Sequence, residues 1–225
     1  MHIAAVPQQN PKGAVEEVRR CAKEFGSRGV VIRGKPHRGR FLDDPAYEEL
    51  WGELERLSIA VGLHHSSHSL VPTLEAHRFS TRFQSATVSH LMEQMSSMVA
   101  LIDSGVLEHH PKLRVVFLES SARWLPYMLY RFDEQYEQLS FEAPWLKMKP
   151  SDYFRRQCWI AVEPDEPHIN MVADYLGEDY TVISSDFPHI DHPPGGLKEF
   201  VERTGVQKPV KRKTSLDNTM RLYGM

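Results

Sequence analysis

The sequence contains only two cysteines among its 225 residues, Cys21 and Cys158. Two thiols cannot form a disulfide framework or a cysteine-based zinc site, so we interpret both as packing residues. Long apolar runs are also missing: the apolar stretches reach only a handful of residues, whereas a membrane-spanning helix needs about 20. The N-terminus lacks the charged and then apolar segments of a signal peptide. These absences predict a cytoplasmic protein with no membrane partner.

The chain has no strong charge of either sign. Its 27 lysines and arginines nearly balance 30 acidic residues, which gives a formal net charge of −3. This balance provides no general attraction to a phosphate backbone, so we expect no nucleic-acid partner. The basic residues are mostly interspersed with acids, except at residues 35–40 and 208–213, and we interpret the second stretch as a solvated helix entry.

The motifs of several common enzyme classes are absent. No glycine-rich dinucleotide-binding or P-loop motif follows the first predicted strand, and no Gly-x-Ser-x-Gly elbow indicates a serine hydrolase. Histidine, in contrast, is abundant, with twelve residues. A metal or proton-transfer site needs clustered histidines. The clusters are His64, His65 and His68; His109 and His110; and His189 and His192.

Strand-like and helix-like segments alternate along the chain. Short runs rich in β-branched residues are each followed by a segment with apolar residues at helical spacing. The six runs lie at residues 2–7, 29–33, 59–64, 113–119, 159–163 and 180–184. This alternation predicts a parallel sheet with helices outside it, because parallel neighbours must be joined by crossovers. Length favours a single domain over residues 1–225, either an open doubly wound sheet or a barrel.

Polar residues at the strand ends indicate where a site could form. His64, Glu119, Glu163 and Asp186 each end or follow a predicted strand, and the carboxyl ends of parallel strands meet at one edge. Imidazole and carboxylate groups together suit Zn²⁺, Mn²⁺ or Fe²⁺. Each position also has an ordinary alternative: a buried histidine at 64, a partner of Arg123 or a helix cap at 119, a plain strand-end acid at 163 and a turn cap at 186.

Three stretches carry a resemblance to a known family: FLESSARWLPYMLYRFD at 117–133, PSDYFRR at 150–156 and SSDFPH at 184–189. With weaker support from the strand ending at His64 and from residues 217–224, the chain resembles the amidohydrolase-related metal-dependent hydrolases that include aminocarboxymuconate-semialdehyde decarboxylase. The resemblance implies a (β/α)₈ barrel whose metal is held by a His-x-His pair on the first strand, a histidine on the fifth and an aspartate on the eighth. By this correspondence His64 is the fifth-strand ligand and Asp186 the eighth-strand ligand. Glu119 ends the sixth strand, where related enzymes often carry a histidine.

The resemblance covers only part of that barrel. Met1 would fall at the start of the third barrel strand, so the His-x-His pair has no counterpart in this sequence. We therefore expect an α/β fold with an incomplete, TIM-barrel-like parallel sheet of about six of the eight strands, the third to the eighth. Six strands cannot close a barrel, and the outer strands would leave unpaired backbone groups that another copy of the chain could cover. A homo-oligomer is expected.

Together, the resemblance and the strand-end residues predict a metal-dependent hydrolase or decarboxylase that acts on a small carboxylated or cyclic substrate. One divalent ion is expected, zinc first and iron or manganese as alternatives, with His64, Asp186 and Glu119 as ligands. Asp186 and Glu119 are also the predicted catalytic proton carriers. The residues predicted to bind the substrate are His90, His189, Arg38 and Arg40. The alternative is a catalytically silent, truncated barrel domain with a structural, oligomerising or ligand-binding role.

Overall fold

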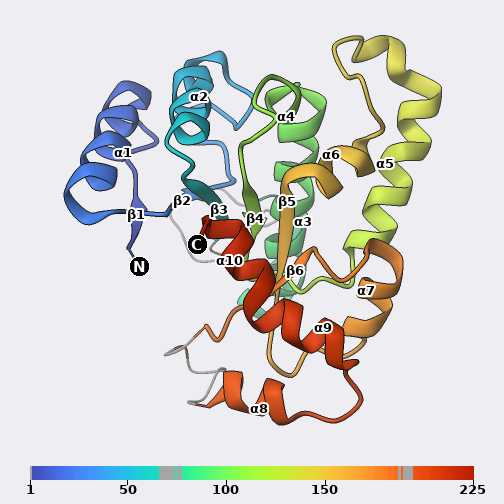
Figure 1. Cartoon of the computed structure of the whole chain (residues 1–225). Coiled ribbons are helices and arrows are strands. Elements are labelled where there is room, and N and C mark those ends of the chain that lie inside the picture. Colours follow the sequence, from blue (N-terminus) through green and yellow to red (C-terminus); the bar gives the residue numbers. More distant parts are fainter. Residues whose placement is uncertain (1, 66–73, 75–77, 187–188, 190–194) are drawn as a thin grey trace.

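The computed structural model describes residues 2–65, 74, 78–186, 189 and 195–225. Within these residues, six strands form one sheet in the order β1-β2-β3-β4-β5-β6, and every neighbouring pair is parallel (Figure 1). The strands are β1 (Ile3–Ala5), β2 (Gly29–Arg33), β3 (Ala60–His64), β4 (Val115–Phe117), β5 (Cys158–Val162) and β6 (Thr181–Ile183). Each strand pairs with its successor in the chain, so every connection crosses back over the sheet. The predicted α/β class and parallel sheet are confirmed.

Helices make these connections and follow the last strand. They are α1 (Pro11–Phe25), α2 (Glu48–Arg56), α3 (Arg82–Asp103), α4 (Val106–His109), α5 (Leu125–Leu139), α6 (Pro150–Gln157), α7 (Ile169–Leu176), α8 (Gly196–Glu202), α9 (Lys208–Arg212) and α10 (Asn218–Tyr223). Shorter or irregular helical segments are η1 (Pro45–Tyr47), η3 (Ser140–Glu142) and the π-helical η4 (Lys213–Asp217), which joins α9 to α10. In the part of the chain that the structure describes, no helix is long and apolar enough to cross a membrane.

Local sequence signals explain the bounds of α1. The Asn10 side chain caps the helix by accepting a hydrogen bond from the Gly13 N–H, and Pro11 occupies the first turn, where its missing N–H costs nothing. The helix ends at Gly26, whose φ of 59° lies in the left-handed region that glycine adopts without strain. These signals place α1 where the sequence predicts it.

The helix α3 begins earlier than its apolar residues indicate. The spacing of apolar residues places the first turn after Thr87, but the helix begins at Arg82. Thr81 and Gln84 form a capping box there, in which each side chain binds the backbone N–H of the other residue. This start signal is present in the sequence, but the first turns of the helix are exposed and carry no apolar stripe that would reveal it.

One face of the sheet, which we call the back face, packs against α1 to α7. Side chains alternate along each strand, so every second residue joins this core. Its strand residues include Val30, Ile32, Val61, Leu63, Val115, Phe117, Ile160 and Val162, each at most 1% exposed. Large helix side chains such as Trp51 and Phe154 complete the cluster. The back-face core fixes the strand ends relative to one another.

The opposite face, the front face, is covered by the C-terminal helix. Its apolar side chains are Ala60, Val116, Trp159, Ala161 and Val182. Leu222 of α10 packs on them and is only 1% exposed, and Tyr223 packs beside it. Gly29 at the start of β2 leaves room for the Tyr223 ring, since an added Cβ would lie 3.0 Å from Tyr223 Cε1. Figure 1 shows α10 crossing in front of the strands.

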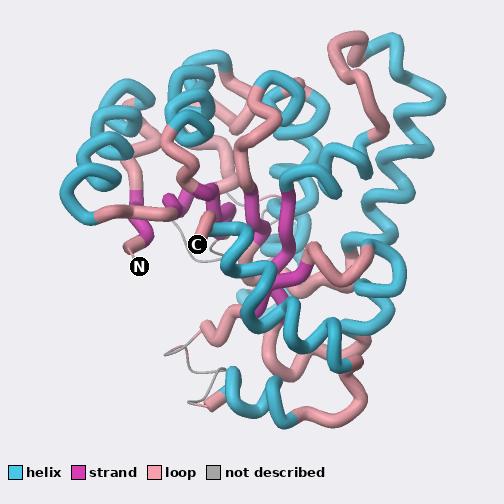
Figure 2. The backbone as a smooth tube through the Cα atoms, in the orientation of Figure 1, coloured by secondary structure: helices cyan, strands magenta, loops and turns pink. Residues whose placement is uncertain are grey.

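The sheet does not close into a barrel. Among the described residues, β1 pairs only with β2 and β6 only with β5 (Figure 2). The outer side of β6 is partly satisfied by other groups, because Asn218 Nδ2 donates to the Thr181 carbonyl at 2.8 Å. The expected incomplete, barrel-like sheet of six parallel strands is therefore the observed one.

Candidate metal centre

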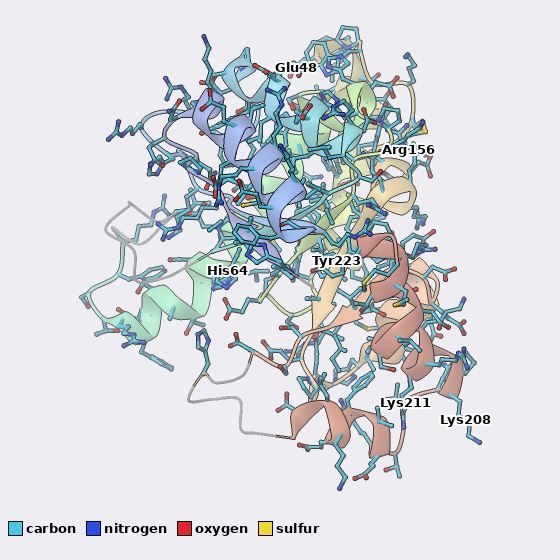
Figure 3. The ribbon with its side chains drawn as sticks, turned by 60° about the vertical axis from the view of Figure 1, so that its left-hand side comes forward. Glu48, His64, Arg156, Lys208, Lys211 and Tyr223 are labelled. Atoms are coloured by element: carbon cyan, nitrogen blue, oxygen red, sulfur yellow. The ribbon has the colours of Figure 1, made fainter. Side chains whose placement is uncertain are left out.

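Four side chains from three strand ends meet at the carboxyl edge of the sheet. His64 is the last residue of β3 (Figure 3), while Glu119 and Asp186 follow β4 and β6 closely. His64 Nε2 lies 2.8 Å from Glu119 Oε2, and these side chains are 37% and 20% exposed. His189 Nδ1 lies 2.7 Å from Asp186 Oδ2 and 3.5 Å from Glu119 Oε1. Glu119 thus contacts both histidines, and the structure places all three predicted ligands at one edge of the sheet. The group whose ligand atoms could hold one ion comprises Glu119, Asp186 and His189, without His64, so the ligand role of His64 stays a prediction.

The acidic pair borders a very small cavity. Glu119, Asp186 and His189 each offer one ligand atom, and these atoms lie within 4.8 Å of one another. The two acids also line a cavity of about 10 Å³, together with Glu163 and Ser184. Roughly 10–15 Å³ is the space needed by one water molecule. The cavity is therefore of the size of a single small ion rather than of an organic ligand.

Mutual interactions shift the pKa values of these groups in opposite directions. The hydrogen bond to Glu119 raises the pKa of His64, although burial opposes it. Burial alone raises the pKa of Glu119, but the hydrogen bond and positive charge of His64 outweigh it and lower that pKa from 4.5 to about 2. Burial, followed by the hydrogen bond and charge of Glu119, raises the pKa of Asp186. The carboxyl groups of Glu119 and Asp186 therefore differ in pKa, with that of Glu119 lowered and that of Asp186 raised.

Glu119 and Asp186 share an unusual backbone conformation. Their φ values are 58° and 46°, in the left-handed region that disfavours residues other than glycine. Each such residue costs roughly 1–3 kcal/mol, and residues of this kind cluster at active sites and ligand clamps. Asp186 also begins a turn in which its carbonyl accepts from the His189 N–H at 2.9 Å, so its functional role stays a prediction.

Gln94 of α3 holds the strand ends that carry His64 and Glu119. Its Nε2 donates to the carbonyl oxygens of Leu63 at 2.9 Å and Leu118 at 2.6 Å, which directly precede the two ligands. The side chain is fully buried. Gln94 thereby fixes the spacing of β3 and β4 just where their backbone pairing ends. The sequence analysis did not identify it, because a glutamine in an amphipathic helix gives no local sign of such contacts.

A second buried side chain, Glu166, holds the loop that follows Glu119. Its carboxylate accepts hydrogen bonds from the Ser121 hydroxyl and, at 2.7 Å, from the Ala122 N–H. Arg203 in turn donates to the Glu166 carbonyl at 2.8 Å. Glu166 is only 3% exposed, so these contacts replace its water shell. It is a positioning residue that the sequence analysis also missed.

His90 lies at the edge of the cluster. Its Nε2 is buried and lies 4.0 Å from Glu119 Oε2, and it has no hydrogen-bond partner among the residues that the structure describes. Burial lowers the pKa of His90, which favours the neutral imidazole. The structure therefore places His90 within reach of the site, and its substrate-binding role stays a prediction.

The predicted arginines lie elsewhere on the loop after β2. Arg38 is exposed, and Arg40 lines a separate hollow with Asn10 and Lys12. Their substrate-binding roles stay predictions. Arg33, which the sequence analysis did not single out, is the arginine paired in register with His64. Two members of the histidine clusters, His68 and His192, lie outside the described residues.

Residues 2–225 match the model of the family described as Amidohydrolase. The chain belongs to the amidohydrolase family. This amidohydrolase chain is 26% identical over 239 residues to gamma-resorcylate decarboxylase from Rhizobium sp., a match that covers 98% of the chain and 69% of that enzyme. It is 24% identical over 209 residues to 2-amino-3-carboxymuconate-6-semialdehyde decarboxylase from Dictyostelium discoideum, which covers 90% of the chain and 56% of that enzyme. The resemblance read from the sequence is confirmed.

Solved structures show the same fold. The amidohydrolase chain matches 5-carboxyvanillate decarboxylase from Sphingomonas paucimobilis with a TM-score of 0.84 at 24% identity, over 99% of this chain and 66% of that one. A dihydroxybenzoic acid decarboxylase from Polaromonas, solved with bound manganese and the inhibitor 2-nitroresorcinol, matches with a TM-score of 0.78 at 22% identity, over 99% of this chain and 68% of that one. The chain therefore spans about two thirds of the length of these structures.

The donor atoms of the amidohydrolase site suit a divalent metal ion. Imidazole nitrogens of His64 and His189 and carboxylate oxygens of Glu119 and Asp186 form a mixed set that Zn²⁺, Mn²⁺ and Fe²⁺ accept. A bound cation would offset the repulsion between the neighbouring carboxylates of Glu119 and Asp186. The described residues thus fit a divalent metal ion.

Proposed function

We propose that this chain forms the metal-binding part of a decarboxylase that acts on a small aromatic carboxylate. The observation that carries the proposal is the convergence of His64, Glu119, Asp186 and His189 at one edge of the sheet. Decarboxylation is favoured over hydrolysis because the relatives and several structural neighbours are named as decarboxylases of such acids. A catalytically silent domain is not favoured, since the donor set is assembled.

His64, Glu119 and Asp186 would hold the ion, with His189 at its border. A bound divalent cation supplies positive charge that polarises substrate oxygens. We propose zinc or manganese, the first from the nitrogen and oxygen donor set and the second from the manganese bound by a structural neighbour. Gln94 and Glu166 would keep these ligands in place from behind.

The reaction needs one proton. When the bond between a ring carbon and its carboxylate breaks, CO₂ leaves with the carboxylate oxygens and the ring carbon takes up a proton. Asp186 and Glu119 are the groups that can carry it, because they are hydrogen-bonded to each other. His189 is 60% exposed and contacts Asp186, so it can return a proton from solvent. His90 Nε2 is buried 4.0 Å from Glu119 Oε2, and the side chain as a whole is 21% exposed.

The assembly would be a homo-oligomer. Among the described residues the outer side of β1 has no strand partner, and Ile3 on this strand is 39% exposed. A second copy would cover this edge. Light scattering after size exclusion measures the mass: a species of about 52 kDa or more supports the proposal, and a 25.9 kDa monomer would contradict it.

Elemental analysis tests the metal site. Protein purified without added metal should contain about one equivalent of zinc, manganese or iron, and Asp186→Ala should lose it. Asp152→Ala on α6 removes an exposed aspartate and should keep the metal. Loaded protein should release CO₂ and resorcinol from 2,6-dihydroxybenzoate, the ligand of one structural neighbour. Equal metal content in both variants would overturn the proposed site.

A further inference from the structure

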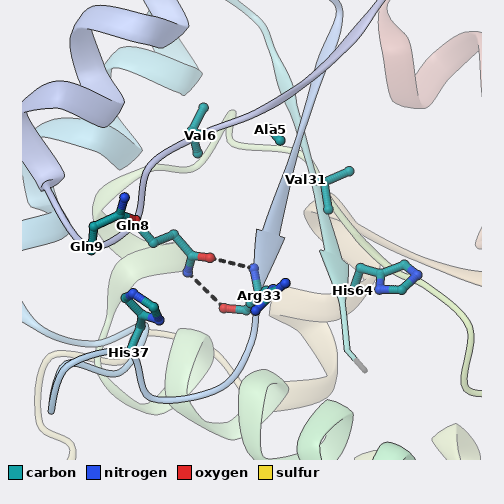
Figure 4. A pocket seen from close by; sticks show the side chains of 8 residues that line it. All are labelled: Ala5, Val6, Gln8, Gln9, Val31, Arg33, His37 and His64. Carbon is teal, nitrogen blue, oxygen red and sulfur yellow. Dashed lines mark hydrogen bonds between the residues drawn. The ribbon is translucent and has the colours of Figure 1, made fainter. Parts of the chain in front are cut away.

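A second hollow opens beside the candidate metal centre on the side of β1 and β2 (Figure 4). Its volume is about 540 Å³, within the roughly 300–1,000 Å³ of small-molecule pockets. The residues that line it are Ala5, Val6, Gln8, Gln9, Val31, Arg33, His37 and His64. His64 belongs to both this hollow and the donor cluster. A molecule bound here would therefore lie next to the metal-binding side chains.

Arg33 and His64 point to the same side of the sheet. They are register partners at the ends of β2 and β3, and both alternate with residues of the back-face core, such as Ile32 and Leu63. Directly paired side chains on adjacent strands lie about 5 Å apart. A carboxylate, which is about 2 Å wide between its oxygens, can contact both residues at once.

The main chain at Arg33 is fixed from two sides. The Gln8 side chain donates to the Arg33 carbonyl at 2.9 Å and accepts from the Arg33 N–H at 2.8 Å (Figure 4). The next residue, Gly34, lies so close to α3 that an added Cβ would be 2.1 Å from Ser97 Oγ. The backbone that carries the guanidinium is therefore held in place before any ligand binds, which lowers the ordering cost of binding.

The hollow has the charge of an anion site. Two residues of its lining, His37 and His64, carry imidazoles, and Arg33 carries a permanent positive charge. None of the lining residues that the structure describes is acidic. In the described part of the chain, no hydrogen bond or ion pair engages the Arg33 guanidinium. Ala5, Val6 and Val31 supply an aliphatic wall on the other side. The lining matches a ligand with one negative end and an apolar body.

We propose that this hollow binds the substrate as a monocyclic aromatic carboxylate, with Arg33 holding the carboxylate at the His64 side and the ring lying against Ala5, Val6 and Val31. The inference rests on the proposed function only for the orientation of the carboxylate toward His64. Binding itself needs Arg33 and the aliphatic wall, not the metal. A planar guanidinium can hold a carboxylate through two parallel hydrogen bonds, which a lysine cannot do.

Binding to metal-free protein separates this inference from the proposed function. Calorimetry in EDTA would measure benzoate, its uncharged analogue benzamide, and acetate. Arg33→Gln should weaken benzoate binding about tenfold or more and leave benzamide within about twofold, because only the charged interaction is lost. Arg33→Lys should give an intermediate loss. The matched control is Arg28→Gln at the other end of β2, exposed and about 17 Å away along the strand, which should keep the affinity for benzoate.

Three results would overturn the inference. Equal losses in Arg33→Gln and Arg28→Gln would mean that overall charge attracts benzoate. Equal affinities for acetate and benzoate would contradict the proposed contact between the ring and the aliphatic wall. Absence of benzoate binding to a folded wild-type protein would remove the site itself. If manganese binding fails but benzoate still requires Arg33, the proposed metal centre is wrong and the carboxylate site stands. Circular dichroism of each variant shows whether it is folded.

Discussion

Leu222→Ala should lower the free energy of unfolding by about 3 kcal/mol, because Leu222 covers the front face of the sheet. The side chain is 1% exposed and packs against Ala60, Val116, Trp159 and Val182. The substitution removes three carbon atoms, which at about 0.8 kcal/mol each corresponds to about 2.4 kcal/mol of lost burial. The cavity left behind adds to this, so that buried leucine-to-alanine changes cost about 2–5 kcal/mol in total. A helix near the chain end can partly collapse, which places Leu222 at the lower end of that range.

Urea unfolding followed by circular dichroism measures this loss. For a chain of this length the melting temperature should fall by roughly 6–12 °C. The matched control is Leu216→Ala in η4, where the side chain is 52% exposed and the expected change is below about 0.5 kcal/mol. A loss below about 1 kcal/mol for Leu222→Ala, with an unchanged denaturant slope, would show that α10 does not cover the front face. The packing argument for the open sheet would then be refuted.

Three further measurements follow from the structure. Gln94→Leu removes the side-chain donor of the Leu118 carbonyl, while the Leu63 carbonyl keeps the Leu118 N–H as a donor, so the unfolding free energy should fall by about 1–3 kcal/mol and manganese affinity by roughly 10–100-fold. Urea titration and calorimetry would measure these two losses, and an unchanged manganese affinity would contradict the positioning role of Gln94. Hydrogen bonds from Arg56 and Arg19 lower the pKa of Glu53 from 4.5 to about 2 despite burial, so its stabilisation is complete above pH 4.5 and is lost as the pH falls toward 2. The lowered pKa of Glu53 corresponds to roughly 3 kcal/mol of stability. About half of this energy remains after solvent screening, because the side chains of Arg19 and Arg56 are 51% and 63% exposed. Glu53→Gln should therefore reduce the loss of stability at acid pH by that remaining half. Manganese at about 100 times its dissociation constant should raise the unfolding free energy by about 2.7 kcal/mol, and EDTA should reverse this increase. A melting temperature that changes neither with manganese nor with EDTA would contradict the metal site.

The sequence predicts the strands well because parallel strands that are buried on both faces consist of nearly continuous runs of β-branched and other apolar residues. The strand over residues 29–33 has the bounds that the pattern gives, and the order of all six strands follows from their alternation with helices. The strand-end rule also brings His64, Glu119 and Asp186 to one edge. These successes depend on local periodicity and on one topological rule.

Contacts between distant segments could not be predicted in this way. Gln94 reaches the carbonyls before His64 and Glu119 from 31 and 24 residues away in the sequence, respectively, and nothing in its own helix distinguishes it. The packing of Leu222 on the front face is equally invisible, because an apolar residue in a helix does not indicate which face of a sheet it meets. Arg33 was overlooked since a charged strand end is usually solvated, and its role follows only from its register with His64.

The left-handed backbone at Glu119 and Asp186 has an evolutionary consequence. Asparagine and glycine adopt this conformation more readily than glutamate, and either would also remove the repulsion between two acids. Under the proposed function, fold stability is given up at two positions in order to place two acids at the site. A related chain without that function would be expected to carry asparagine or glycine there and to be more stable.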